Sequence, residues 1–499
     1  MEILGSDILS YIYRYLLVDD LFHCLHTCKF LNKTPVNVFN ISWCDNLKDL
    51  FSLANFTNLQ SLNINYCDKF SDLSGLKKFT NLISLEVNHC NNLKNLSLLG
   101  VMYKLKILKC ENSNNVDFSF LSRLTNLQTL DIGGCHNLKD LYPLYNLLKL
   151  RTLVLSDCYK LSDLSELSNL INLLSLDLGG CRNITDLSPL YNLTKLQILN
   201  CQNLYSKDFS FLYILTNLHT LNLSNCDNLL SLSPLSNLTK LQTLDLSRCI
   251  NITDLSPLSK MCKLRELDLS QCRNITDLSP LSKMCKLREL GLGQCRNITD
   301  FSPLSELTNL QSLSLDGCDI TNLSGLSNLT NLQSLSLCYC DNLTDLSGLA
   351  KITKLQKLIL CCCNKLSDLS GLSELTNLQT LDLSRCINIT DLSPLFNLTN
   401  LHTLVLSGCE NITDISSLSE MCELRELFLS GCKNITDLSP LSKMCELREL
   451  YISECENITD ISPLYELYEL RKLDIRFNYY IKNLFGLSKL RNLYIIRFK

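Results

Sequence analysis

One unit of about 23 residues repeats along almost the whole chain, and no other feature of the sequence restricts the fold as strongly. The unit is clearest over residues 241–258, LQTLDLSRCINITDLSPL, where a cysteine marks the register. The mark recurs from Cys44 to Asn478 at a constant spacing, except for three intervals that are shorter by a single position. Seventeen of the 28 cysteines share this position, which predicts one structural role, most clearly for Cys226, Cys249, Cys272, Cys295, Cys386, Cys409, Cys432 and Cys455.

Each part of the unit has a simple local interpretation. The alternation Leu244–Leu246 predicts a short strand with both leucines inward and the aspartate between them outward. The thiol of Cys249 suits a buried column, because it is a small hydrophobe and a weak donor. The asparagine two positions after each mark is expected to bond to local backbone in a turn. The segment Asp254–Pro257 predicts a cap followed by one short helical turn.

Stacking of these units gives the expected fold. Because each unit can bury its leucines only against its neighbours, we expect an α/β solenoid. A unit this short leaves little room for a full outer helix. The concave side of the solenoid is a parallel β-sheet, and its convex side is mostly 3₁₀ turns or extended segments. About 20 repeats are expected over residues 35–478, with a closing repeat or cap over 479–499. Such a solenoid has an extended, solvent-exposed surface and lacks the deep apolar cavity that small-molecule sites favour, so we expect it to bind a macromolecule.

The pattern LxxLxLxxC, followed by a polar turn and (I/L)xxLxxL, resembles the leucine-rich repeat over residues 36–499. The segment ITDLSPL is similar to the short repeats of internalins and their intracellular relatives. The cysteine at the mark resembles the cysteine-containing repeats of F-box proteins. The resemblance implies a horseshoe that binds a protein target on its concave face. The Asn/Lys/Ile-rich composition and the copied units also resemble leucine-rich-repeat proteins of amoeba-infecting giant viruses.

Residues 1–34 depart from the repeat and show apolar residues at helical spacing. They form either an N-terminal cap for the first coil or a segment that resembles an F-box, although Gly5 stands where that family has proline. The F-box resemblance implies docking on a Skp1-like adaptor through an apolar surface made of Leu4, Ile8, Leu9, Ile12 and Leu16.

The composition limits the classes of partner and the cellular compartments that we expect for this protein. The chain has 46 basic and 50 acidic residues, a net charge of −4, which disfavours nucleic-acid binding. No apolar run is long enough to span a bilayer and no basic leader is present, so we expect no membrane span and no secretion. Frameworks of many disulfides belong to short secreted chains, and this chain is long. We therefore expect an intracellular, reducing location in the cytoplasm, that of a host cell if the viral resemblance holds.

The outward strand position between the two inward leucines shows where a partner would bind. It is acidic or small through the middle, at Asp131, Asp177, Asn222, Asp245, Asp268, Gly291, Ser314 and Ser336. It then becomes apolar at Val405, Phe428 and Tyr451, with Glu426 and Glu449 at the preceding outward positions. Exposed aromatic groups on a rigid sheet suit an interaction patch, although single exposed apolar residues are ordinary. A weaker cluster is Asn63, Tyr66, Glu86 and His89.

Motifs for catalysis or cofactor binding are missing from the sequence. No phosphate-binding loop, nucleophile elbow or zinc-protease motif occurs, so we expect no enzymatic activity, cofactor or metal. The one dense thiol group includes Cys338 and Cys361, which occupy equivalent outward positions on adjacent coils. Their sulfurs are expected to lie close, as a redox or metal pair or by chance accumulation of cysteines.

Three functions remain open at this point. The leading hypothesis is an F-box-type adaptor that brings a target to an SCF-like ubiquitin ligase. The second is a general binding scaffold with a purely structural N-terminal cap. The third is a surface adhesin of the internalin type.

Overall fold

The computed structural model describes residues 38–43, 50, 58–93, 96–113, 117–481 and 483–497. The predicted N-terminal segment 1–34, with Leu4, Ile8, Leu9, Ile12 and Leu16, lies outside the described residues. The chain divides into two compact units, one ending at Leu241 and one running from Gln242, with Leu230–Ser233 belonging to the second.

In the described residues the strands are short and parallel, nine of them in unit 1 and twelve in unit 2. Unit 1 contains β1 (Val38–Asn40), β2 (Ser61–Asn63), β3 (Ser84–Glu86), β4 (Ile107–Lys109), β5 (Thr129–Asp131), β6 (Thr152–Val154), β7 (Ser175–Asp177), β8 (Ile198–Asn200) and β9 (Thr220–Asn222). Unit 2 contains β10 (Thr243–Asp245), β11 (Glu266–Asp268), β12 (Glu289–Gly291), β13 (Ser312–Ser314), β14 (Ser334–Ser336), β15 (Lys357–Ile359), β16 (Thr380–Asp382), β17 (Thr403–Val405), β18 (Glu426–Phe428), β19 (Glu449–Tyr451), β20 (Lys472–Asp474) and β21 (Tyr494–Ile496).

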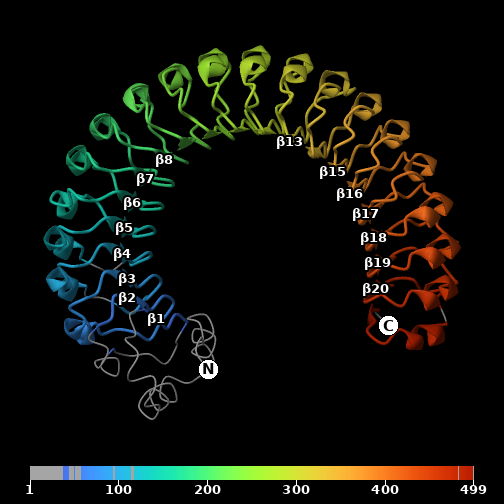
Figure 1. Ribbon diagram of the computed structural model, residues 1–499, viewed down its shortest axis with the longest axis horizontal. Coiled ribbons are helices and arrows are strands. Elements are labelled where there is room, and N and C mark those ends of the chain that lie inside the picture. The colour runs from blue at the N-terminus through green and yellow to red at the C-terminus, as the bar shows by residue number, and fades with distance from the viewer. Residues whose placement is uncertain are drawn as a thin grey trace, which may run out of the picture. The chain divides into compact units, whose positions relative to one another are not determined.

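The other side of the coils carries short 3₁₀ helices, as predicted. Those up to the end of unit 1 are η2 (Ser74–Lys78), η3 (Ser97–Val101), η4 (Ser119–Arg123), η5 (Tyr142–Leu144), η6 (Ser165–Asn169), η7 (Ser188–Asn192), η8 (Ser210–Ile214) and η9 (Ser233–Leu235). Those of unit 2 are η10 (Ser256–Lys260), η11 (Ser279–Lys283), η12 (Ser302–Glu306), η13 (Ser324–Leu326), η14 (Ser347–Leu349), η15 (Ser370–Leu372), η16 (Ser393–Leu395), η17 (Ser416–Glu420), η18 (Ser439–Lys443), η19 (Ser462–Glu466) and η20 (Phe485–Lys489). Within each unit the strands line the inner side and the helices the outer side (Figure 1).

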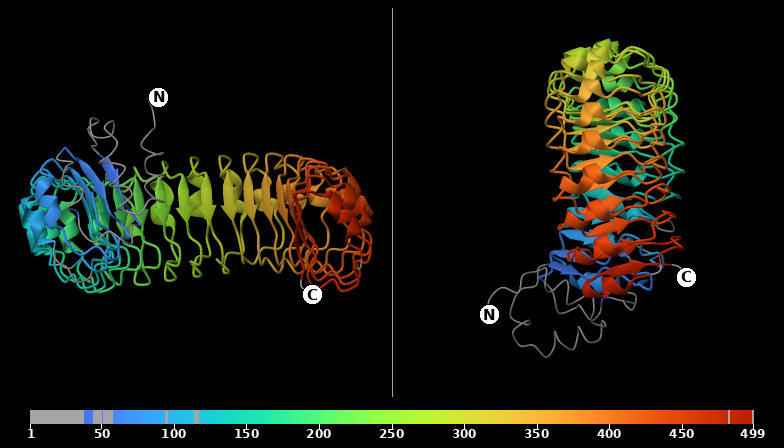
Figure 2. Two further views of the ribbon diagram at one scale, coloured as in Figure 1. Left: turned by 90° about the horizontal axis from the view of Figure 1, so that it is seen from below. Right: turned by 90° about the vertical axis from the view of Figure 1, so that its right-hand side faces the viewer.

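The core lies between these two sides and is built from the apolar positions of the repeat. In one coil of unit 2, the buried side chains are Leu244, Leu246, Cys249, Ile252, Leu255, Leu258 and Met261. Burial of each large apolar side chain stabilises the fold by roughly 1.5–3 kcal/mol. Successive coils stack in register, so Leu244 pairs with Leu267 and Asp245 with Asp268, and the strands lie side by side (Figure 2). The predicted fold is therefore confirmed.

A left-handed corner follows each strand from β1 to β20. The residue just before each register position has a positive φ of 56–75°, from Trp43 to Phe477. Fifteen of these residues are not glycine, although side chains disfavour this conformation. The backbone N–H of Arg248 at this corner donates to the Ser270 carbonyl oxygen of the next coil at 2.7 Å, which helps to offset the conformational cost. At the fifteen corners that are not glycine, the side chains form a second row beside the strands.

Two further polar positions fix the coil. The Asp254 carboxylate accepts the backbone N–H of Ser256, the first residue of η10, at 2.8 Å, whereas the cap position itself is occupied by Leu255, which makes no side-chain cap hydrogen bond. The expectation that the asparagine after the mark bonds to local backbone is wrong. The Asn274 side-chain amide donates instead to the Ile250 carbonyl oxygen of the preceding coil, at 2.9 Å. The coils are only one strand spacing apart, so the neighbouring carbonyl is within reach of a short side chain.

Candidate functional site: the strand face and its neighbouring corners

The cysteines at the register position donate hydrogen bonds between neighbouring coils. The Cys272 thiol donates to the Leu246 carbonyl oxygen, and the Cys295 thiol donates to the Leu269 carbonyl oxygen, both at 3.1 Å. Burial raises the pKa of Cys226 to about 12, so its thiol keeps the proton that it donates. The predicted ladder residues are all buried, and none of them is disulfide-bonded: Cys226, Cys249, Cys272, Cys295, Cys386, Cys409, Cys432 and Cys455. Their role is structural and leaves binding to the exposed rows.

In two coils the register position has no cysteine, and a cysteine stands three residues before it instead. Ser113 and Leu204 occupy the mark in these coils, and Cys110 and Cys201 fill the second inward strand position. Both cysteines are fully buried. The Cys201 carbonyl oxygen accepts the Cys226 thiol at 3.1 Å, so the ladder bond continues across the altered coil.

The strand-face patch of Val405, Phe428 and Tyr451 is assembled on three adjacent strands, β17 to β19. The register pairs Val405 with Phe428 and Phe428 with Tyr451. The two aromatic rings stack with centroids 4.4 Å apart and planes inclined by 9°. All three side chains are half-buried, so each keeps an exposed edge. The structure therefore brings the three predicted apolar residues into one continuous surface.

Charged groups frame this patch. The Tyr451 hydroxyl donates to the Glu449 carboxylate at 2.6 Å, and the Lys472 ammonium lies 4.9 Å from the Tyr451 ring centroid. The same ammonium lies 3.8 Å from the Glu449 carboxylate. Burial, together with the Glu449 hydrogen bond, raises the pKa of Tyr451, so its hydroxyl stays protonated at neutral pH. Glu426 accepts a hydrogen bond from the Thr403 hydroxyl at 3.4 Å. The patch offers an apolar surface with Glu426, Glu449 and Lys472 beside it.

The weaker cluster predicted in unit 1 is also brought together. The Asn63 amide donates to the Glu86 carboxylate at 3.2 Å across β2 and β3. The Tyr66 and His89 rings stack at the left-handed corners, with centroids 4.5 Å apart. Trp43 extends this stack, with its ring 4.0 Å from that of Tyr66 and 60% of the residue exposed. The sequence interpretation missed Trp43, although its place directly before the Cys44 mark matches those of Tyr66 and His89.

The acidic row on the strand face has a structural use. The Asp177 carboxylate accepts the backbone N–H of Gly179, and the Asp268 carboxylate accepts that of Ser270, both at 2.8 Å. Each aspartate thus satisfies the turn that follows its own strand. Burial, with a hydrogen bond to the Glu111 carboxyl group, raises the pKa of Asp131 to about 7. Periodic acids on this face therefore do not by themselves indicate a ligand site.

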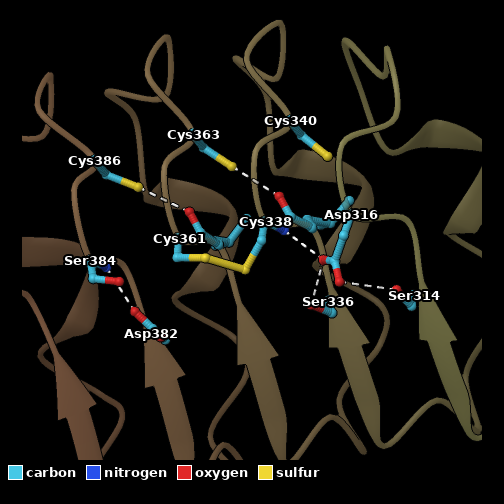
Figure 3. Close-up of a disulfide and its surroundings, with 12 residues drawn as sticks. Ser314, Asp316, Ser336, Cys338, Cys340, Cys361, Cys363, Asp382, Ser384 and Cys386 are labelled. Carbon is cyan, nitrogen blue, oxygen red and sulfur yellow. Dashed lines mark hydrogen bonds between the residues drawn. A yellow bond between two sulfur atoms is a disulfide. The ribbon is translucent and has the colours of Figure 1, made fainter. Parts of the chain in front are cut away.

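The dense thiol group contains a cross-link between two coils. A disulfide joins Cys338 to Cys361, which follow β14 and β15 (Figure 3). The Cys338 backbone N–H and the Ser336 hydroxyl both donate to the Asp316 carboxylate, at 2.8 and 2.6 Å. The buried ladder thiols of Cys340 and Cys363 lie beside the disulfide and are free. The expected proximity of Cys338 and Cys361 is therefore a covalent bond.

Over the described residues, no group of three or more histidine, cysteine or acidic side chains could hold a metal ion. Within the same part of the chain, no helix has the length and apolar character needed to cross a bilayer. The cavities are shallow and open, with lining residues that are mostly polar.

A family model described as leucine-rich repeats in two copies matches residues 216–260, 262–306, 308–351, 330–374, 353–397, 376–420 and 422–466. No curated protein sequence matches the chain significantly. Among solved structures, an internalin from Listeria monocytogenes is 29% identical with a TM-score of 0.52. That alignment covers 66% of this chain and 87% of the internalin chain.

A second solved structure, the TLR13–ssRNA13 complex, is 21% identical with a TM-score of 0.59. That alignment covers 92% of this chain and 84% of the TLR13 chain, and at this identity it shows the fold alone. The repeat, the parallel sheet of short strands and these matches agree with one another. The chain is a leucine-rich repeat protein with internalin-like neighbours among solved structures.

Proposed function

We propose that the protein is a non-enzymatic scaffold that binds a target protein through the strand-face patch of unit 2. The observation that carries this proposal is the stack of Phe428 on Tyr451, 4.4 Å apart, at outward positions of β18 and β19. Aromatic residues on a rigid surface lose little side-chain entropy when a partner covers them, so they make effective anchors. Glu449 already lies 3.8 Å from the Lys472 ammonium, so Glu426 is the acid beside the stack that favours a partner segment with an apolar residue next to a basic one.

Target capture by immobilised full-length protein tests this proposal. The double variant Phe428→Ala/Tyr451→Ala is expected to lose the target that the wild type retains. The variant Ile359→Ala is the matched control, because Ile359 is an apolar residue at the equivalent outward position of β15. Loss of the target in Ile359→Ala and its retention in the double variant would place the binding surface elsewhere.

A finer role rests on the sequence of residues 1–34. We propose that this segment acts as an F-box and docks on a Skp1-like adaptor, which would make the protein a substrate adaptor of a ubiquitin ligase in the cytoplasm. Co-purification with a Skp1-like protein is expected, and the variants Leu9→Asp and Ile12→Asp should abolish it. Phe428→Ala/Tyr451→Ala should keep the adaptor while losing the target. Failure of the wild type to bind any Skp1-like protein would leave only the scaffold function.

The similarity to an internalin supports a different candidate, a surface adhesin. The state of the Cys338–Cys361 pair separates the two roles, because disulfides persist in oxidising compartments and are rare in the cytosol. Alkylation of freshly lysed cells followed by mass spectrometry should find both thiols reduced if the cytoplasmic adaptor role is correct. A fully oxidised pair on protein recovered from a cell surface would favour the adhesin.

A further inference from the structure

Two blocks of copied coils in unit 2 differ at one charged position. An arginine stands directly before the strand in both blocks, at Arg265 and Arg288 before β11 and β12, and at Arg448 and Arg471 before β19 and β20. Two positions before each arginine, the first block has lysine, at Lys263 and Lys286, and the second block has glutamate, at Glu446 and Glu469. Residues 275–290 and 435–450 differ only by Lys286 in place of Glu446, so this pair isolates the effect of one side chain.

In the second block the glutamates neutralise the arginines. The Arg448 guanidinium lies 3.9 Å from the Glu446 carboxylate, and the Arg471 guanidinium lies 3.5 Å from the Glu469 carboxylate. The positive charge of each arginine is therefore balanced by a glutamate of the same coil. The second block therefore offers no concentrated positive charge along this row.

In the first block the positive charges converge on a cavity. Arg265, Lys286 and Arg288 line a shallow cavity of about 330 Å³, together with Asn309 and Gln311. Across the described residues, no carboxylate lies within ion-pair distance of these three cations. The acid next to Arg265, Glu266, accepts a hydrogen bond from the Thr243 hydroxyl of the preceding coil at 3.1 Å. Three cations thus face one open space with two amide side chains.

The chemistry of these groups selects an oxyanion. Guanidinium groups match the oxygens of phosphate or carboxylate with paired N–H donors, and an ammonium adds a point charge. Three positive charges balance a dianion better than a single carboxylate. The three cations of this cavity lie on two adjacent coils of a chain with net charge −4, whereas nucleic-acid binding needs a longer basic stripe. The cavity therefore suits one isolated phosphate group.

We propose that the cavity between Arg265, Lys286 and Arg288 binds the phosphate monoester of a phosphorylated partner protein. This inference rests on the proposed protein-binding function, to which it adds a requirement for phosphorylation. A phosphate ester at this site and an apolar residue at the strand-face patch would be separate contacts within unit 2.

Calorimetric titration of the full chain tests the site without the partner. The probes are the peptide Gly-Gly-phosphoserine-Gly-Gly, its unphosphorylated form, inorganic phosphate and a short oligouridine RNA. The phosphopeptide should bind more tightly than inorganic phosphate at a site that depends on Lys286, while the unphosphorylated peptide should not bind. Lys286→Glu should weaken the phosphopeptide at least about tenfold, because it installs the neutralised arrangement of the second block. Its thermal unfolding should match the wild type, since the same glutamate is accommodated at Glu446.

A gain-of-function variant gives the converse test. Arg425, Glu446, Arg448, Glu469 and Arg471 stand at the repeat positions of the cavity residues Arg265, Lys286, Arg288, Asn309 and Gln311. The triple variant Glu446→Lys/Glu469→Asn/Arg471→Gln therefore copies the cavity onto the second block and should add one binding site to the wild-type stoichiometry. Unchanged affinity in Lys286→Glu, no phosphopeptide binding by the wild type, or a tighter Lys286-dependent complex with the RNA would each overturn the proposal. Phosphopeptide binding should be unaffected by Phe428→Ala/Tyr451→Ala, so failure of the strand-face patch and failure of this cavity are separate results.

Discussion

The Asn478 side-chain amide donates a hydrogen bond of 2.6 Å to the backbone carbonyl oxygen of Ile452. In the preceding coil, the Cys455 thiol makes the equivalent bond to the Leu429 carbonyl oxygen at 3.0 Å. Asparagine therefore replaces the ladder cysteine at the last register position. Its Oδ1 atom, however, is buried and has no hydrogen-bond partner among the described residues. A thiol supplies the one donor that the site needs and adds no strong acceptor.

Replacing Asn478 with cysteine should therefore stabilise the last coil. Asn478→Cys keeps a donor for Ile452 and removes the unpartnered amide oxygen, which should add about 1 kcal/mol. Hydrogen exchange of backbone amides in β20 and β21 measures the change as slower exchange. Asn478→Ala, which removes the donor as well, should exchange faster than the wild type. Faster exchange in Asn478→Cys would show that the thiol cannot substitute at this site.

The sequence predicted which side chains of each coil are buried and which are exposed, because the spacing of the apolar residues follows the pattern of burial directly. Leu244, Leu246 and Cys249 lie in the core as expected, and Asp245 lies outward. Contacts between coils were harder to predict, because they depend on the offset between successive strands. The Asn274 bond to Ile250 follows from that offset.

For the candidate site, the sequence placed Phe428 and Tyr451 on one face but did not predict that their rings stack. Trp43 was missed because the left-handed corner is a property of the backbone, and no single residue type marks it. Trp43, Tyr66 and His89 occupy that corner on three successive coils. A search of every register position for aromatic residues would have found this stack.

The Cys338–Cys361 disulfide should stabilise unit 2. It joins positions with a sequence separation of 23, for which restriction of the unfolded chain predicts about 3 kcal/mol. The variant Cys338→Ser/Cys361→Ser should lower the urea midpoint under non-reducing conditions. Wild-type protein in dithiothreitol should show the same midpoint as this variant. Equal midpoints for oxidised wild type and the variant would contradict the cross-link.

Stability should depend on pH through Asp131. Burial, with a hydrogen bond to Glu111, raises the pKa of Asp131 from its usual 3.8 to about 7. The folded chain therefore holds this proton more tightly than the unfolded chain, and the stabilisation is lost as the pH rises through about 7. Asp131→Asn keeps an acceptor for the Gly133 N–H and removes the titration. The melting temperature of Asp131→Asn minus that of the wild type should increase from about pH 5 to about pH 8. A difference that is constant with pH would contradict the raised pKa.

The aromatic ring of Tyr451, rather than its hydroxyl, should carry target binding. Tyr451→Phe loses the hydrogen bond to Glu449 but keeps the stack on Phe428, so affinity for the target should change by less than about twofold. Tyr451→Ala removes the stack and should weaken binding at least about tenfold. Surface plasmon resonance with the captured target measures both variants. An equal loss in the two variants would assign the binding energy to the hydroxyl.

Site-specific photo-crosslinking in cells measures most directly whether the strand-face patch holds a partner. Phe428→p-benzoylphenylalanine places the reactive group at the centre of the patch, on β18. Val154→p-benzoylphenylalanine places it at the equivalent outward position of β6, as the control. We predict one dominant crosslinked protein from position 428, lost when Tyr451→Ala is added, and no such product from position 154. Crosslinking of the same protein from position 154 but not from position 428 would contradict the proposed binding surface.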